Sequence, residues 1–257
     1  MSTRPHTDGS AGDVDYSALA GGYSRYRQPD PRIETTILTA LGDAVTVLNV
    51  GAGAGSYEPL DRVVTAVEPS ESMRAQRPSG RPAIDATAES LPFDDDSFDA
   101  SMATFSVHQW PDVETGLAEM RRVTRGPVVL LTADPARVEL FWLNHYAPEV
   151  MGTEAGRYPN LDRIADALGG ARVAEVAIPF DCTDGFNEAY YGRPEMFLDR
   201  GARAANSAWS FVGPRVEERF VRDLSADLES GRWDAKYGDL RTMPTFDGAL
   251  RLVIGRP

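Results

Sequence analysis

The chain has 257 residues, 42% of them hydrophobic, and a net charge of −13 from 26 basic and 39 acidic residues. This length fits one large α/β domain with an insertion or a small cap, and the composition supplies a sizeable core. The acidic balance argues against a nucleic-acid partner, because such partners bind to a basic face. Cys182 is the single cysteine, which excludes an internal disulfide and a cysteine metal cluster.

Residues 1–15 are polar and contain no apolar stretch. We therefore expect neither a signal peptide nor a membrane span there, and we interpret the segment as a disordered lead-in. The domain itself is expected to cover residues 16–257, and the protein is expected to be cytoplasmic.

Short apolar runs then alternate with helical patterns, which predicts a βαβ arrangement. The predicted strands lie at 45–50, 63–67, 82–85, 98–104, 127–132, 172–178 and 248–254. The predicted helices lie at 111–125, 160–168, 194–210 and 214–230, with a further helix from Ala136 that Pro148 ends.

The first two strands indicate a nucleoside site. The strand at 45–50 runs into Gly51, Gly53 and Gly55, and the strand at 63–67 ends at Glu68. Glycines after a buried strand let the backbone approach a ligand that a Cβ atom would hold away. A carboxylate at the end of the neighbouring strand can accept hydrogen bonds from both hydroxyls of a ribose.

The turn after the first strand favours a nucleoside without phosphates. A dinucleotide fingerprint has a third glycine at the position of Ser56, followed by a long helix whose N-terminus holds a pyrophosphate. Here only residues 56–62, with Pro59 among them, precede the next strand. That is room for about two helical turns at most.

Residues 47–58 resemble motif I of S-adenosylmethionine-dependent methyltransferases of the Rossmann-like class. Residues 67–70 resemble the loop that holds the ribose in that family, and residues 87–93 resemble its adenine-side loop. Residues 94–99 resemble the entry to the family's fourth strand, and residues 105–112 resemble the loop that leaves this strand. The resemblance extends over residues 16 to about 135. Two positions depart from the family pattern, since Asn49 and Thr87 stand where acids are usual.

The resemblance implies a mostly parallel seven-stranded α/β sheet with an antiparallel last strand, and S-adenosyl-L-methionine as the cofactor. It also implies a helical insertion between the sixth and seventh strands, at residues 180–247. The cofactor-binding residues implied by the resemblance are Tyr23, Arg27, Gly51, Ala52, Gly53, Glu68, Pro69, Thr87, Ala88 and Thr104.

The insertion is rich in aromatic side chains, and it follows a strand whose carboxyl end lies at the ligand-binding edge of such sheets. With the segment 16–31 it is interpreted as a lid over a substrate pocket, although the same aromatic residues could simply pack the inserted helices onto the core. The predicted substrate-binding residues are Trp110, His145, Tyr146, Tyr190, Tyr191 and Arg193.

His108 leaves the fourth strand beside the expected methyl group and is the candidate catalytic residue, as a general base. The alternative is that it packs beneath Trp110 and orders the loop. No metal site is predicted, because the acidic run 94–96 lacks convergent ligands. The predicted function is methyl transfer to a small organic acceptor. The alternatives are a nicotinamide-dependent oxidoreductase and a protein that binds the cofactor without transferring its methyl group.

Overall fold

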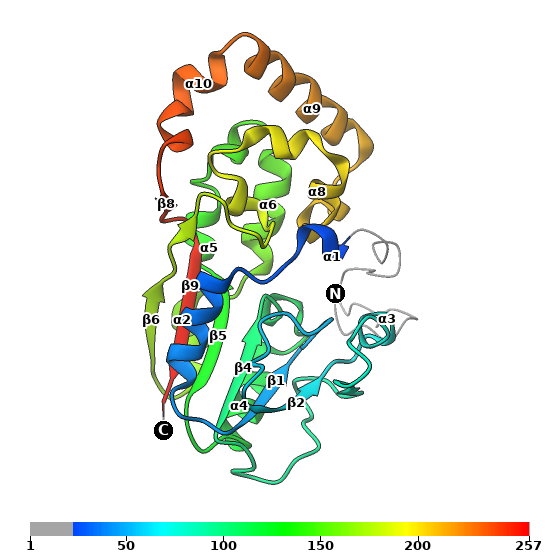
Figure 1. Ribbon diagram of the computed structural model, residues 1–257, viewed down its shortest axis with the longest axis vertical. Helices are drawn as coiled ribbons and strands as arrows, with labels where there is room; N and C mark the ends of the chain where they lie inside the picture. Colours follow the sequence, from blue (N-terminus) through cyan, green and yellow to red (C-terminus); the bar gives the residue numbers. More distant parts are fainter. Residues whose placement is uncertain (1–22, 257) are drawn as a thin grey trace.

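The protein is built on one seven-stranded sheet, seen in a computed structural model that describes residues 23–256 and the side chains from Arg25 onward (Figure 1). The strand order is β3-β2-β1-β4-β5-β9-β6, and only β9 runs antiparallel to its neighbours. The strands are β1 (Thr46–Val50), β2 (Val63–Val67), β3 (Ala83–Ile84), β4 (Ala100–Thr104), β5 (Val128–Ala133), β6 (Ala171–Glu175) and β9 (Leu250–Gly255). The predicted sheet, including its antiparallel last strand, is confirmed.

Alternate side chains of each central strand are buried on opposite faces of the sheet, because successive side chains of a strand point to opposite faces. In β1, Val47 packs into the cluster that contains helix α2 (Pro31–Leu41), whereas Leu48 packs into the cluster that contains α4 (Val113–Arg122). Both helices carry an apolar stripe and begin at an aspartate cap, Asp30 and Asp112. The carboxyl ends of the parallel strands are thereby held at one edge of the sheet.

Several further helices gather beyond those carboxyl ends, as Figure 1 shows for α6, α8, α9 and α10. Those between β5 and β6 are α5 (Pro135–Val138), the 3₁₀ helix η3 (Trp142–His145) and α6 (Pro148–Arg157), whereas α7 (Leu161–Ala167) packs on the sheet beside α4. Those between β6 and β9 are η4 (Asn187–Tyr190), η5 (Pro194–Leu198), α8 (Arg200–Ala204), η6 (Ser207–Phe211), α9 (Pro214–Glu229), α10 (Arg232–Tyr237) and η7 (Gly238–Arg241). The remaining short elements are α1 (Tyr23–Tyr26), α3 (Glu71–Arg74), η2 (Val107–Gln109), β7 (Ile178–Pro179) and β8 (Thr245–Phe246).

Two of the predicted helices are wrong in detail. The helix predicted from Ala136 stops at Val138, and Pro148 begins α6 instead of ending a helix. Proline suits a first helical turn, where its missing N–H would have no partner anyway. The predicted helix 194–210 is three short helices, because Asp199 and Asn206 adopt extended backbone and Asp199 caps α8 by accepting from the Gly201 N–H.

The segment between β6 and β9 is part of the main core. Its large aromatic side chains Phe197, Trp209, Phe220 and Trp233 are buried in the same cluster as α2 and β5. Trp142 of η3 packs edge-on against both Phe197 and Trp233. The helices of this segment therefore cannot be removed without exposing the interior. Among the described residues, no helix has the length and apolar character needed to cross a bilayer.

Candidate functional site

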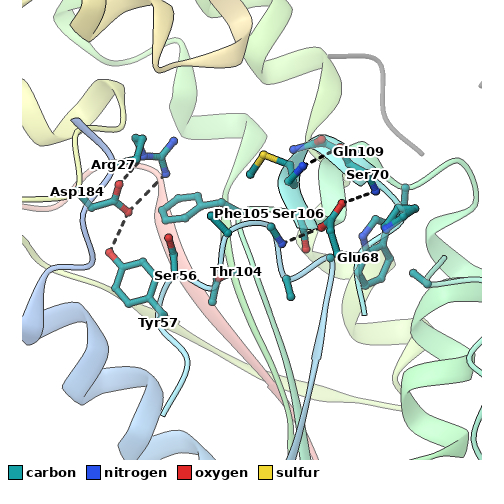
Figure 2. A pocket seen from close by; sticks show the side chains of 18 of the residues that line it. Arg27, Ser56, Tyr57, Glu68, Ser70, Thr104, Phe105, Ser106, Gln109 and Asp184 are labelled. Atoms are coloured by element: carbon teal, nitrogen blue, oxygen red, sulfur yellow. Dashed lines mark hydrogen bonds and ion pairs between the residues drawn. The ribbon is translucent and has the colours of Figure 1, made fainter. Parts of the chain in front are cut away.

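The glycine turn after β1 forms one wall of a cavity at the carboxyl edge of the sheet (Figure 2). Gly51 and Gly53 adopt φ values of 65° and 51°, a region that favours glycine. A Cβ atom on Gly51 would lie 2.7 Å from the Ser106 Oγ atom. In the described chain, residues 51–62 form turns and no helix, so the glycines lead to no helical platform for a pyrophosphate.

Glu68 follows β2 and faces the glycine turn. Its Oε2 atom accepts from the Gly53 N–H at 2.8 Å, and its Oε1 atom accepts from the Ser70 N–H at 2.9 Å. The residue is 7% exposed, and this burial raises the pKa of its carboxyl group. Each carboxylate oxygen can accept a second hydrogen bond, so a ribose diol fits here with both backbone contacts kept.

The cavity measures about 900 Å³ including its open mouth, and it brings together most of the predicted cofactor-binding residues. Those that line it are Arg27, Gly51, Ala52, Gly53, Glu68, Pro69, Ala88 and Thr104. Trp110, predicted on the substrate side, lines the same cavity with Met73, and these two offer apolar surface for a flat base. Thr87 is not in the lining, where Ala88 and Glu89 stand instead, and the side chain of Tyr23 lies outside the described residues.

A buried ion pair holds the glycine turn from behind, and the sequence prediction missed it. Arg77 donates to both oxygens of Glu58 at 2.7 and 2.9 Å and to the Gly53 carbonyl at 3.1 Å. The amide of Asn49 donates to Glu58 Oε1 at 3.0 Å. This contact accounts for the departure at position 49, because an acid there would face the Glu58 carboxylate.

The opposite end of the cavity is closed by three side chains from distant segments. Arg27, just after α1, forms a bidentate ion pair with Asp184, and the Tyr57 hydroxyl donates to the same carboxylate at 2.9 Å (Figure 2). Burial and the adjacent Asp184 raise the pKa of Tyr57. Arg27 therefore lies where it was predicted, but its guanidinium is already engaged with a carboxylate. Asp184 and Tyr57 had no signal in the sequence pattern.

His108 lies in η2 and faces a neighbouring space instead of the main cavity. Its ring packs on Tyr158 with centroids 4.6 Å apart, and its Nδ1 atom is buried with no hydrogen-bond partner in the described residues. Burial, with smaller contributions from Arg157 and Arg27, lowers the pKa of His108 well below its usual value. The imidazole is therefore neutral at physiological pH.

We use the term inner chamber for two adjoining narrow spaces behind Phe105, of about 480 and 350 Å³ including the open solvent at their mouths. Arg27, Phe105 and Gln109 line both the cofactor cavity and the first space, and Phe105, Glu154 and Tyr158 line both spaces. Phe105 adopts φ 52°, which is costly for a bulky residue and persists because the surroundings fix it. The ring at the end of β4 thus stands between the cofactor cavity and the inner chamber.

The structure does not bring the other predicted substrate residues to this site, so those placements are wrong. His145 is on an outer groove beside α9, with its Nδ1 atom 3.1 Å from Lys236 Nζ. Tyr146 donates to Asp227 at 2.9 Å in the same groove. The break after Val138 redirects this segment toward α9 and α10.

The two tyrosines of the insertion that were predicted to bind the substrate pack in the core instead of lining a pocket. Tyr190 and Tyr191 are fully buried, and the Tyr191 hydroxyl donates to the Met243 carbonyl at 2.6 Å. Arg193 donates to the carbonyls of Cys182 and Ala189. Cys182 is buried, and burial raises the pKa of its thiol to about 12, which rules out a ready nucleophile.

Comparisons with known proteins agree with this geometry. A family model described as a methyltransferase domain matches residues 48–131. A crystal structure from Anabaena variabilis, described as a candidate methyltransferase of an antibiotic biosynthesis pathway, is 30% identical and has a TM-score of 0.84, covering 90% of this chain and 99% of that one. The uncharacterized methyltransferase YcgJ of Bacillus subtilis is 32% identical over 115 residues, which are 40% of this chain and 42% of that protein.

A more distant structure shares the fold. Geranyl diphosphate C-methyltransferase of Streptomyces coelicolor, crystallised with Mg²⁺, geranyl diphosphate and S-adenosyl-L-homocysteine, has a TM-score of 0.51 at 14% identity. The match covers 88% of this chain and 78% of that one.

Proposed function

We propose that this chain, which belongs to the family of class I S-adenosylmethionine-dependent methyltransferases, transfers the methyl group of its cofactor to a small organic acceptor held in the inner chamber. The observation that supports the acceptor class is the narrowness of that chamber. Its two spaces lie behind Phe105, and the volumes of about 480 and 350 Å³ include the open solvent at their mouths, so only a small group can enter them. A base in a nucleic acid or a protein side chain would need an open approach to this position.

Some residues of the cofactor site would bind the cofactor directly, and others hold the glycine turn in position. S-adenosylmethionine supplies an electrophilic methyl group on a sulfonium sulfur. Glu68 would accept the ribose hydroxyls, and the glycine turn would let the nucleoside lie against the backbone. Arg77 and Glu58 fix that turn, because they tie the Gly53 carbonyl to a buried ion pair.

The acceptor side supplies alignment and the exclusion of water. Methyl transfer is an in-line displacement, so holding the nucleophile near the methyl carbon provides much of the rate. Phe105 lies between the cofactor cavity and the inner chamber. The methyl group would therefore move past this side chain on its way to the acceptor. The segment 180–247 contributes Asp184 to the cofactor cavity and Phe186 and Asn206 to the inner chamber, and its role in binding the acceptor stays a prediction.

His108 would contact the acceptor from the wall of the first space, and its lowered pKa makes it a weak base. Its unpaired Nδ1 atom suits a hydrogen bond to the acceptor better than the removal of a proton. The absence of nucleic-acid partners and the cytoplasmic location stay predictions from the acidic composition and from residues 1–15, which lie outside the described residues.

The proposal is tested with S-adenosylmethionine that carries a tritiated methyl group. The protein is incubated with the labelled cofactor and, separately, with small-molecule, nucleic-acid and protein fractions of a bacterial extract. We expect label in the small-molecule fraction with the wild type and much less with Glu68→Ala when the cofactor is below saturation. Label confined to nucleic acid or protein would contradict the proposed acceptor class.

A further inference from the structure

Glu154 lines both spaces of the inner chamber from helix α6, and it is the feature on which the inference depends. Its Oε2 atom accepts a hydrogen bond from the Asn187 side-chain amide. Within residues 23–256, its Oε1 atom has no hydrogen-bond partner and the carboxylate has no ion-pair partner. Glu154 is half-buried, and a carboxylate partly withdrawn from water is stabilised when a cation or a donor reaches its free oxygen.

The cationic groups near Glu154 are already engaged elsewhere. Arg27 is bound to Asp184, and Arg157 donates to Ser207 Oγ at 2.8 Å while its guanidinium lies 4.9 Å from the ring centroid of Phe211. His108 is neutral. None of these groups forms an ion pair with Glu154 among the described residues, so its Oε1 atom stays available to a ligand.

The deeper space adds a second carboxyl group and an apolar lining. Glu188 is buried there, and both of its oxygens accept from the Ala249 N–H. The rest of this space is formed mainly by apolar side chains, among them Val138, Met151, Phe186 and Leu250. An acceptor that bore a carboxylate would face the carboxyl groups of Glu154 and Glu188, whereas an apolar body with a positive or donating group matches both features.

We propose that the acceptor is a small amine whose nitrogen donates an N–H to Glu154 Oε1 while its apolar body fills the deeper space. This inference rests on the proposed function and specifies the chemical class of its substrate. His108 Nδ1 is a second atom that can accept an N–H, since a neutral imidazole has one acceptor nitrogen. Together the two side chains would orient the nitrogen toward Phe105 and the cofactor cavity.

The reaction balances with these groups alone. An ammonium acceptor first gives one proton to the Glu154 carboxylate, which leaves a neutral amine and a carboxylic acid. The nitrogen lone pair then forms the new N–C bond to the methyl carbon as the S–C bond breaks and its electron pair stays on sulfur. The products are a protonated methylamine and neutral S-adenosylhomocysteine.

The surroundings of Glu154 favour this proton transfer. Burial raises the pKa of its carboxyl group, whereas the Asn187 hydrogen bond and the charges of Arg157 and Arg27 lower it to a smaller extent. Glu188 also interacts unfavourably with Glu154 when both are charged. A carboxylate with a raised pKa is a stronger base than an exposed glutamate, as transfer from an ammonium group requires.

The test uses 2-phenylethylamine and its neutral counterpart 2-phenylethanol as probes. Their affinities are measured by calorimetry at neutral pH on protein saturated with S-adenosylhomocysteine, for the wild type, Glu154→Gln and Glu149→Gln. Glu149 is on the same helix but is exposed and paired with Arg219, so its variant is the matched control. We expect the wild type and the control to prefer the amine by about ten- to a hundredfold. In Glu154→Gln this preference should disappear while S-adenosylhomocysteine still binds.

Equal affinity for the two probes, no detectable binding of the amine, or a preference that survives in Glu154→Gln would overturn the inference. A transfer assay with tritiated cofactor and a panel of amines, phenols and carboxylic acids separates it from the proposed function. Label on phenols alone would refute the amine and leave the small-molecule acceptor standing. Cofactor binding without label on any small molecule would refute the proposed function itself.

Discussion

The cofactor cavity and the inner chamber are built in different ways although they share Phe105. The cofactor cavity is formed by consecutive residues at the ends of neighbouring parallel strands, and its main contacts come from the backbone of residues 51–53 and from Glu68. The inner chamber collects single side chains from η2, α6 and the segment between β6 and β9. Backbone geometry is encoded locally, whereas the chamber exists only after distant segments have packed.

This difference indicates which substitutions the cofactor cavity and the inner chamber each tolerate. Glycines and a strand-terminal acid serve the same nucleoside in many sequences, so the cofactor half is constrained by conformation. The chamber is constrained by the shape and charge of one acceptor, and a few substitutions there would change its chemistry without altering the sheet. Variants in the two halves should therefore have separable effects on stability, cofactor affinity and turnover.

The largest expected effect is the loss of stability when the buried ion pair behind the glycine turn is broken. Glu58→Ala should lower the free energy of unfolding by about 3–5 kcal/mol, because it leaves Arg77 buried without its partner. Glu114→Ala removes a half-exposed pair with Arg163 and should cost less than about 1 kcal/mol. Urea denaturation measures both, and equal losses would mean that the buried pair does not support the turn.

Gly51→Ala should weaken S-adenosylmethionine binding by on the order of a hundredfold, since strained backbone costs roughly 1–3 kcal/mol and the new Cβ atom would meet Ser106 as well. Gly80→Ala is the control, because a Cβ atom there meets nothing within 4 Å. Calorimetry gives both affinities. Normal binding by Gly51→Ala would show that the turn does not need this conformation.

Glu68→Ala should weaken cofactor binding by about ten- to a hundredfold, because hydrogen bonds to a charged group contribute roughly 1.5–3 kcal/mol. The fold should be kept, as judged by circular dichroism. Glu71→Ala, at an exposed position in the first turn of α3, should bind the cofactor normally. If both variants bind equally well, the ribose assignment fails.

In the chamber half, burial raises the pKa of Glu188 to about 8. The native state therefore binds this proton more tightly than the unfolded chain does, and its contribution to stability is lost as pH rises from about 5 through 8. The slope from this group should reach at most about 1.4 kcal/mol per pH unit. Glu188→Gln cannot titrate, so the unfolding free energy of the variant should fall less over this range. Parallel curves for the two proteins would contradict the raised pKa.

The smallest effect is expected for His108→Ala on turnover, measured once an acceptor is available. Loss of one hydrogen bond should lower the rate about tenfold or less. A general base would be worth roughly 10²–10⁴. A loss in the higher range would restore His108 as the base and would reduce Glu154 to an anchoring role.

The sequence predicted what depends on local pattern. Glycine at 51 and 53, the acid at 68 and the positions of the strands along the chain follow from short-range patterns, whereas the seven-stranded sheet was expected from the family resemblance. Glu154 and Asp184 could not be found in this way, because each lies in an unremarkable helix or loop and gains its role from partners far away in the chain. The break at Asp199 was missed since the aspartate caps the next helix, a contact that competes with continuing the first.

His145 and Tyr146 were predicted to line the pocket and lie elsewhere, which shows the same limit of prediction from local pattern. Their placement in the pocket assumed one helix after β5, and the actual break after Val138 turns them toward α9. An error in one backbone segment thus moved two side chains to another surface. Position along the chain predicts the edge of the sheet that a segment reaches, but it does not predict which side chains face the cavity.

The most direct test of the account is a crystal structure of the protein with S-adenosylhomocysteine. The account predicts that both ribose hydroxyls lie within hydrogen-bonding distance of Glu68, and that the sulfur lies beside Phe105 and faces the inner chamber. A ribose bound away from Glu68, or a sulfur directed to the open mouth of the cavity, would contradict it.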